Sequence, residues 1–177
     1  MNAFVNIAIY QVIWFVCIRY GNIGGMISLP LLAIHLILSD KRKEDLKTMG
    51  LLLVAGIIID GILNVSGFFA FDPPGFPIPP WLMVIWLGLA TLVHHSLAWL
   101  KSRLLLCALL GALGGPIAYW SGVRMGAAVF NWELLPSLLV LAAIWASLWP
   151  GVMYLAGNAD SRKHIRQRRR PAGHTER

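Results

Sequence analysis

Six long runs of apolar residues dominate this chain, and short polar or proline-rich breaks separate them. A helix needs about 20 apolar residues to cross a bilayer, and each run approaches or reaches that length. The runs are continuous and do not show the alternation of an outer-membrane barrel, so the pattern favours helices. We predict an all-α membrane protein, a six-transmembrane-helix bundle forming one domain over residues 1–157. The predicted spans are about 3–20, 22–39, 48–71, 81–100, 104–122 and 135–156.

Two of the breaks indicate where the chain reverses. Residues 20–25 contain three glycines, which permit a tight hairpin between the first two spans. Residues 72–80 contain five prolines, which cannot continue a helix and predict a stiff, extended loop. Trp81 follows at the depth where tryptophan anchors at a membrane interface.

Composition agrees with this pattern. Of the 177 residues, 58% are hydrophobic and 13% are charged, whereas globular chains are about 25% charged. The length is used up by six spans, which leaves no room for a separate soluble domain.

The net charge of +7 would suggest a nucleic-acid partner in a soluble protein, but its distribution indicates a membrane topology. Residues 40–47, residues 101–103 and the segment after Gly157 hold thirteen of the fifteen Lys and Arg residues. Such an excess marks cytoplasmic loops. All three segments lie on one side only if the chain has six spans, so we predict cytoplasmic N and C termini. Residues 158–177 are predicted to be a disordered basic tail that contacts anionic lipid.

Neither the N-terminal segment nor the cysteines change this prediction. Met1–Tyr20 lacks a basic leading region and a cleavage site, so it is predicted to be an uncleaved first span. Cys17 and Cys107 are predicted near opposite faces of the bilayer, too far apart for a disulfide. The sequence indicates no cofactor.

Asp60 is the only charged residue in the apolar run of residues 49–71. A carboxylate in hydrocarbon is costly, so such a residue usually faces the bundle interior and marks a functional site. The alternative is a hydrogen bond that only joins helices. Gly56, Asp60 and Asn64 follow one another at helical spacing and share one face of the span.

His94 and His95 stand together in the fourth predicted span, and His35 lies at a similar depth in the second. Adjacent residues point about 100° apart on a helix, so His94 and His95 cannot both face one ligand squarely. Their spacing matches no zinc motif, and we predict no metal site. Histidine titrates near neutrality, which makes His95 and His94 candidates for a general acid or base. The alternative is that they only bond neighbouring helices.

The candidate site combines these residues with polar and aromatic side chains of the other spans. The catalytic candidates are Asp60, His95 and His94. The substrate-binding candidates are Asn64, Gln11, Trp14, Trp86, Trp99 and Tyr119.

Several motifs of these spans resemble one protein family. They are Asn6-x4-Gln11-x2-Trp14, Gly56-x3-Asp60, Pro80-Trp81-x4-Trp86, His94-His95-Ser96-Leu97-x-Trp99-Leu100, and Gly114-Gly115-Pro116-x-Ala118-Tyr119-x2-Gly122-x3-Gly126-Ala127. Together they resemble DUF2878, a group of bacterial membrane proteins of unknown function, from Asn6 to about Gly157. The resemblance implies an integral inner-membrane protein and an association with genes of lipid modification. The family often has Asn where this chain has His94, which favours His95 as the functional histidine.

The sequence supports three functional hypotheses. The first is a small intramembrane enzyme, or an accessory to one, that acts on a lipid or small hydrophobic substrate through a pocket around Asp60 and His95. The second is a proton- or cation-coupled permease, although the chain lacks the internal repeat of many transporters, and a homodimer would have to supply the second half. The third is a scaffold whose polar residues only bind helices. The expected partners are membrane lipids and not nucleic acid, and the expected location is the bacterial inner membrane.

Overall fold

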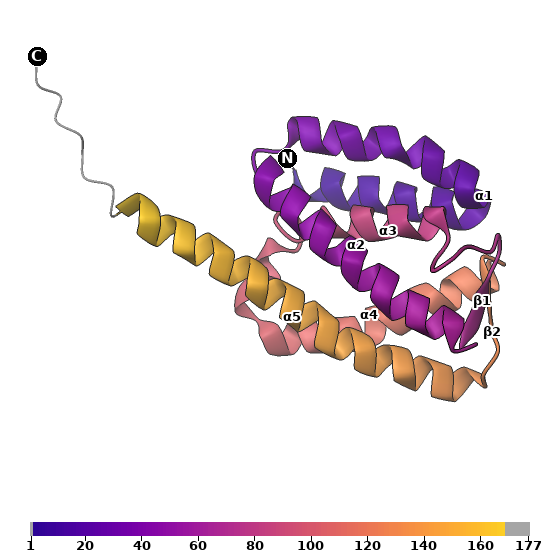
Figure 1. Cartoon of the computed structure of the whole chain (residues 1–177). Helices are drawn as coiled ribbons and strands as arrows, with labels where there is room; N and C mark the ends of the chain where they lie inside the picture. Colours follow the sequence, from indigo (N-terminus) through magenta and orange to yellow (C-terminus); the bar gives the residue numbers. More distant parts are fainter. Residues whose placement is uncertain (1, 169–177) are drawn as a thin grey trace, which may run out of the picture.

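The computed structural model of the chain describes residues 2–168 and is almost entirely helical over that range (Figure 1). Its elements in chain order are α1 (Ala3–Leu38), α2 (Arg42–Val65), β1 (Phe69–Phe71), α3 (Pro80–Ala90), the 3-10 helix η1 (Ala98–Ser102), α4 (Leu104–Arg124), β2 (Ala128–Phe130) and α5 (Leu134–Arg168).

Four of the five α-helices in residues 2–168 are long and apolar enough to cross a membrane. They are α1, α2, α4 and α5, in which the qualifying stretch is Leu134–Ala159. The fifth helix, α3, is apolar but only 11 residues long. The protein is therefore membrane-embedded by the length and composition of its helices, but the six separate helices expected from the sequence are five in the structure.

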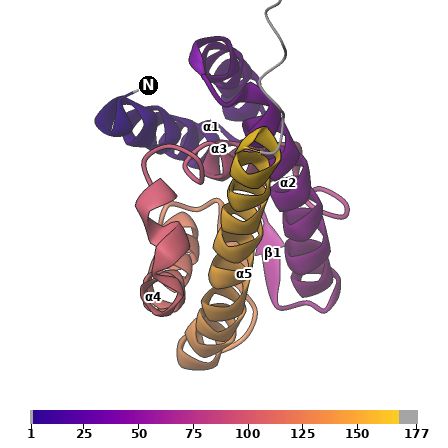
Figure 2. The same cartoon turned by 90° about the vertical axis from the view of Figure 1, so that its left-hand side faces the viewer.

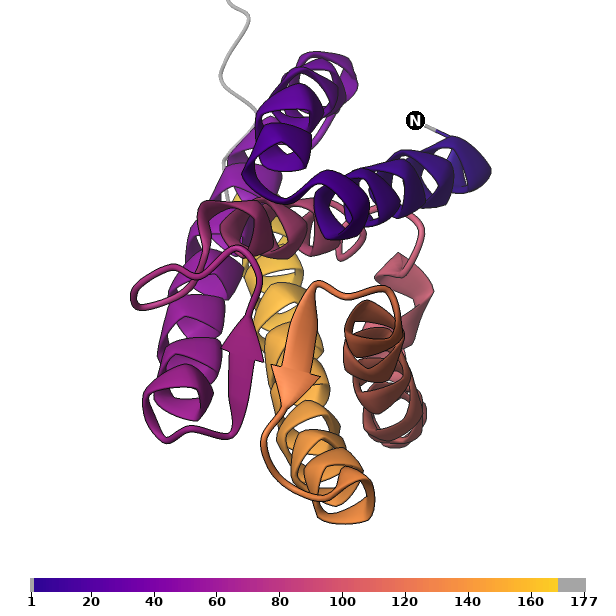
Figure 3. The same ribbon diagram turned by 90° about the vertical axis from the view of Figure 1, so that its right-hand side faces the viewer.

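The first two predicted spans are two arms of α1, which bends at Gly21 (Figure 3). Gly21 has φ 55° and ψ −132°, a conformation outside the helical region that glycine adopts readily. A side chain there would also lie 2.7 Å from the Pro73 ring. Cys17 donates a hydrogen bond to Ser28 at 3.8 Å, although the two are eleven residues apart. A straight helix would separate their Cα atoms by about 16 Å, so the arms fold back on each other.

The fourth predicted span is not the continuous helix expected over residues 81–100. It ends as α3 at Ala90, residues 91–97 form turns, and η1 begins at Ala98. Buried Asn6 compensates for the break: its amide donates to the Thr91 carbonyl at 3.3 Å and accepts from the Ser96 backbone N–H at 3.2 Å. Irregular backbone at membrane depth is tolerated where protein satisfies its polar groups in this way.

The helices form two groups around α3. In Figure 1, α3 lies between α1 and α2, and Figure 2 shows α4 beside α5. Glycines allow the close approach of α4 to α5, because a methyl group at Gly111 or Gly115 would overlap Trp145. An antiparallel pair of short strands, with Phe69 opposite Phe130, joins the ends of α2 and α4. The hydropathy pattern did not predict this sheet.

The C-terminal helix extends beyond the last predicted span. α5 continues through Arg168, so residues 158–168 are helical. Residues 169–177 lie outside the described part of the chain, and their disorder stays a prediction.

Candidate functional site

Asp60 is completely buried in α2, and both of its carboxyl oxygens accept hydrogen bonds from aromatic side chains. The Trp86 indole N–H donates to Oδ2 at 2.8 Å from α3. The Tyr119 hydroxyl donates to Oδ1 at 2.6 Å from α4. One carboxyl group thus joins three helices, and the polar atoms that would be costly in hydrocarbon are paired.

The two donors belong to a larger aromatic assembly. The Trp86 ring stacks on Trp145 of α5, with ring centres 5.3 Å apart and planes 7° apart. Tyr119 stacks on Phe69 of β1 at 6.0 Å. Gly56 provides the space for this arrangement, because a methyl group at that position would overlap the Trp86 ring. In the Gly56-x3-Asp60 motif, the glycine therefore leaves space for the Trp86 ring and the aspartate accepts the hydrogen bond of its N–H.

A cavity of about 790 Å³ lies beside this assembly and is bounded by α1, α3, α4 and α5. Its wall is mostly apolar. Four of the predicted substrate-binding residues line it: Gln11, Trp14, Trp86 and Tyr119. Asp60 does not line the cavity, since it lies behind the two aromatic side chains that it binds.

Asn64 and Trp99, two further predicted substrate-binding residues, lie away from the cavity. The Asn64 amide donates to the carbonyls of Gly75 at 3.3 Å and Pro77 at 3.0 Å, and so holds the proline-rich loop against α2. Trp99 is half exposed, with the Arg103 guanidinium 5.5 Å from its ring centre.

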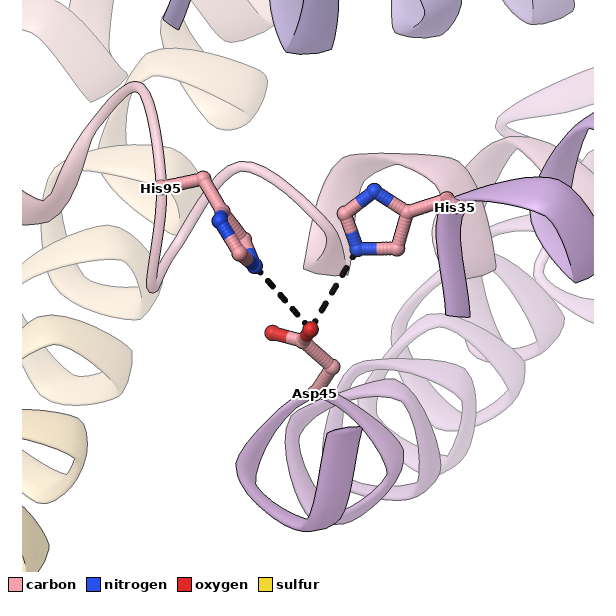
Figure 4. A group of neighbouring side chains, drawn as sticks. All are labelled: His35, Asp45 and His95. Atoms are coloured by element: carbon pink, nitrogen blue, oxygen red, sulfur yellow. Dashed lines mark hydrogen bonds and ion pairs between the residues drawn. The ribbon is translucent and has the colours of Figure 1, made fainter. Parts of the chain in front are cut away.

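The predicted catalytic His95 belongs to a second polar cluster (Figure 4). Its Nε2 lies 3.0 Å from Asp45 Oδ2, and Nε2 of His35 lies 3.3 Å from the same oxygen. Ser39 donates a short hydrogen bond to this oxygen and lies 3.2 Å from His95 Nε2. Figure 4 shows both imidazoles pointing at one carboxylate. The His35 and His95 rings lie edge to face, with their centres 5.0 Å apart.

His94 has different partners from those of its neighbour. Its Nδ1 accepts from the Lys101 ammonium at 2.9 Å, and its Nε2 lies 2.9 Å from the Thr48 hydroxyl. Lys41 donates to the His94 carbonyl at 3.3 Å. Since Nδ1 is the acceptor, Nε2 carries the proton and donates to Thr48. His94 therefore binds both Lys41 and Lys101 near the break in the fourth predicted span.

The structure does not bring Asp60 and His95 into one pocket. Asp45, the partner of His95, precedes Asp60 by fifteen residues in α2, which corresponds to about 22 Å along the helix. The chain thus has two separate polar centres. The cavity with its aromatic wall can hold an apolar molecule, and the histidine–aspartate cluster can exchange protons or bind a cation.

Sequence reasoning did not select Asp45 or His35. Asp45 stands in a charged stretch that the hydropathy pattern assigned to a loop, whereas the structure has it in the first turns of α2. His35 and Asp45 are ten residues apart, on either side of the tight connection at residues 39–41. A turn this short places the end of one helix beside the start of the next, but the sequence predicted a longer connection between residues 39 and 48 and gave no signal of the pairing.

Comparison with known proteins gives one family and no individual relative. The sequence model of the family described as "Protein of unknown function (DUF2878)" matches residues 3–151. No curated protein and no solved structure matches the chain.

Proposed function

The chain belongs to the DUF2878 family of proteins of unknown function, and we propose that it binds the acyl chain of a membrane lipid in the cavity beside Tyr119. The observation that carries this proposal is the cavity, with its volume of about 790 Å³ and its apolar wall. Sites for drug-sized ligands have about 300–1,000 Å³. The helices around it are long enough to lie in a bilayer, where lipid chains are the abundant ligand.

The length of the cavity suits a lipid chain. Helix α4 alone contributes wall residues from Leu110 to Arg124, which corresponds to a rise of about 21 Å. The hydrocarbon of one leaflet is about 15 Å deep, half the thickness of the bilayer core. An acyl chain can therefore lie along the cavity. A cation-coupled permease would instead need a polar path, so the apolar wall favours the lipid over the permease.

Polar groups of the wall would select the lipid. Hydrocarbon tails are as apolar as the wall, so apolar contact alone gives little preference for one molecule. The cavity also includes the exposed side chains of Gln11 and Arg124. Within the described part of the chain, the guanidinium of Arg124 makes no hydrogen bond or ion pair, and Arg124 lies at the end of α4. We propose that it binds the anionic headgroup, a phosphate or carboxylate.

In this proposal Asp60 is a positioning residue. It holds Tyr119 and Trp86 in the wall but does not contact the ligand. Tyr119 is then the group best placed to act on a bound lipid, because its hydroxyl is held by a carboxyl group beside the cavity. His95 would act in the other cluster, whereas His94 binds Thr48 and Lys101 outside it.

We also propose six crossings of a bacterial inner membrane, with the basic end and both termini in the cytoplasm. The fold-back of α1 at Gly21 supports the additional crossing. Lys41 and Lys101 meet at His94, and a side chain at Gly157 would lie 3.7 Å from Lys101 Cβ. The three basic segments thus meet at one end, as expected for a cytoplasmic face.

Photocrosslinking tests lipid binding directly. The full chain in lipid nanodiscs is given a phospholipid whose acyl chain carries a diazirine, and labelled peptides are identified by mass spectrometry. We expect labelling in the cavity segments of α1 and α4, with competition by unlabelled lipid. The variant Gly114→Phe would fill the cavity, because a side chain there meets no atom within 4 Å at its first carbon. It should reduce cavity labelling about tenfold, a loss of about 1.4 kcal/mol.

Gly151→Phe is the matched control. Gly151 also has open space around it, but it lies on α5 away from the cavity. It should leave cavity labelling unchanged. Equal labelling of the wild type and Gly114→Phe would contradict the proposal, as would labels confined to surfaces outside the cavity.

A further inference from the structure

We propose that His35, His95 and Asp45 bind a zinc ion that joins the end of α1, the start of α2 and the turns after α3. This inference is independent of the lipid cavity, and it reverses the expectation of no metal site that the residue spacing gave. The three ligands come from three segments of the chain, so no local spacing motif in the sequence indicated a metal site.

The distances suit a tetrahedral ion. The ligand atoms of the three side chains all lie within 4.8 Å of one another. Both Nε2 atoms lie 3.0–3.3 Å from Asp45 Oδ2. Ligands at the usual 2.0–2.1 Å from a tetrahedral zinc ion are separated by about 3.3 Å from each other. The two nitrogen–oxygen separations are therefore close to those that the ion requires, and Figure 4 shows the rings converging on the carboxylate.

Unpaired polar atoms provide a second observation. Three buried side-chain nitrogen or oxygen atoms lack a hydrogen-bond partner among the described residues, and two of them belong to this cluster. They are Asp45 Oδ1 and His35 Nδ1, both in side chains with no exposed surface. His35 Nδ1 is the ring nitrogen that does not face Asp45, so only the carboxylate oxygen bears on the ion. An unpaired buried carboxylate oxygen is unfavourable, and an ion beside the carboxylate would compensate for it.

Ser39 would orient a zinc ligand without binding the ion itself. Its hydroxyl accepts from the Lys41 backbone N–H at 3.0 Å and donates to Asp45 Oδ2. It also lies 3.2 Å from His95 Nε2. Partners of this kind fix the orientation of metal ligands. Two imidazoles and a carboxylate are typical zinc ligands, and a set of three leaves the fourth position of the ion for water or another small ligand.

Cobalt titration of the full chain tests the site. Tag-free protein is purified in detergent, stripped with a chelator, and titrated with Co²⁺, whose tetrahedral complexes absorb visible light. We expect about one equivalent of cobalt per chain with a tetrahedral spectrum, displaced by zinc. Zinc should raise the midpoint of thermal unfolding, since a ligand that binds only the folded state stabilises it.

Matched histidine variants locate the ligands. His95→Gln should weaken cobalt binding by more than about 100-fold, beyond the loss caused by an outer-shell change. His94→Gln removes the neighbouring histidine and should leave cobalt binding unchanged, because that ring is bound to Thr48 and Lys101. His164 and His174 are present in both variants.

Two results would overturn the proposal. One is a wild-type chain without a tetrahedral cobalt spectrum, and this result needs no variant to fold. The other is equal cobalt affinity in His95→Gln and the wild type. Either would leave a hydrogen-bonded histidine–aspartate cluster, and neither bears on lipid labelling in the cavity.

Discussion

Removal of the Tyr119 hydroxyl tests the contact that organises the cavity wall. Tyr119→Phe deletes one oxygen and leaves Asp60 Oδ1 without its donor, since Trp86 bonds the other oxygen. The ring can keep its stacking on Phe69. The change should therefore report on the hydrogen bond more than on packing.

The structure places this bond at the strong end of its class. Its O···O distance of 2.6 Å lies within the roughly 2.5–2.7 Å of charge-assisted O–H···O bonds. Asp60 is fully buried, so water does not replace the lost donor. Hydrogen bonds between membrane helices contribute about 0.6 kcal/mol on average and about 1.7 kcal/mol at most. We expect a coupling of about 1.5 kcal/mol between the two side chains.

A double-mutant cycle measures that coupling. The free energy of unfolding is determined in mixed micelles for the wild type, Tyr119→Phe, Asp60→Asn and the double variant. Tyr154→Phe is the control, because Tyr154 is exposed on α5, and it should change stability by less than about 0.5 kcal/mol. Additive effects of Tyr119→Phe and Asp60→Asn, with a coupling below about 0.5 kcal/mol, would refute the role assigned to Asp60.

Three further results are expected. Asn6→Ala should destabilise the fold by about 1–3 kcal/mol, because the Thr91 and Ser96 groups that the Asn6 side chain binds lose their partner. Hydrogen exchange at residues 91–97 should increase for the same reason, and unchanged exchange would contradict the prediction. Gly56→Ala should lower stability by about 1–3 kcal/mol and shift Trp86 fluorescence, because the added methyl group displaces the indole. No change in stability or fluorescence would show that Trp86 does not pack closely against residue 56. Reporters fused to either terminus should be active only in the cytoplasm, and a periplasmic signal from one of them would contradict the proposed six crossings.

The hydropathy pattern predicted the helical, membrane-embedded class but not every boundary. It placed helices near α2, α4 and α5. It began the third span at residue 48, whereas α2 begins at Arg42. Charged residues end an apolar run without ending a helix, because a helix satisfies its backbone internally whatever its side chains are.

The break after α3 could not be derived from hydropathy. Four of residues 91–97 are polar, but polar side chains alone do not end a helix, and Asn6, which satisfies the irregular backbone, lies 85 residues away from Thr91. The same reason hid the pairing of His35 with Asp45, which depends on how two helices meet. Asp60 was recognisable because it is a lone charge in its run, but its donors Trp86 and Tyr119 come from distant helices.

The most direct test of the lipid-binding account is an experimental structure of the chain in a lipid bilayer. The account predicts elongated density along α4 between Gly114 and Arg124, in contact with the Tyr119 ring. Direct packing of α1 against α4, with the cavity closed and no lipid chain beside Tyr119, would contradict it.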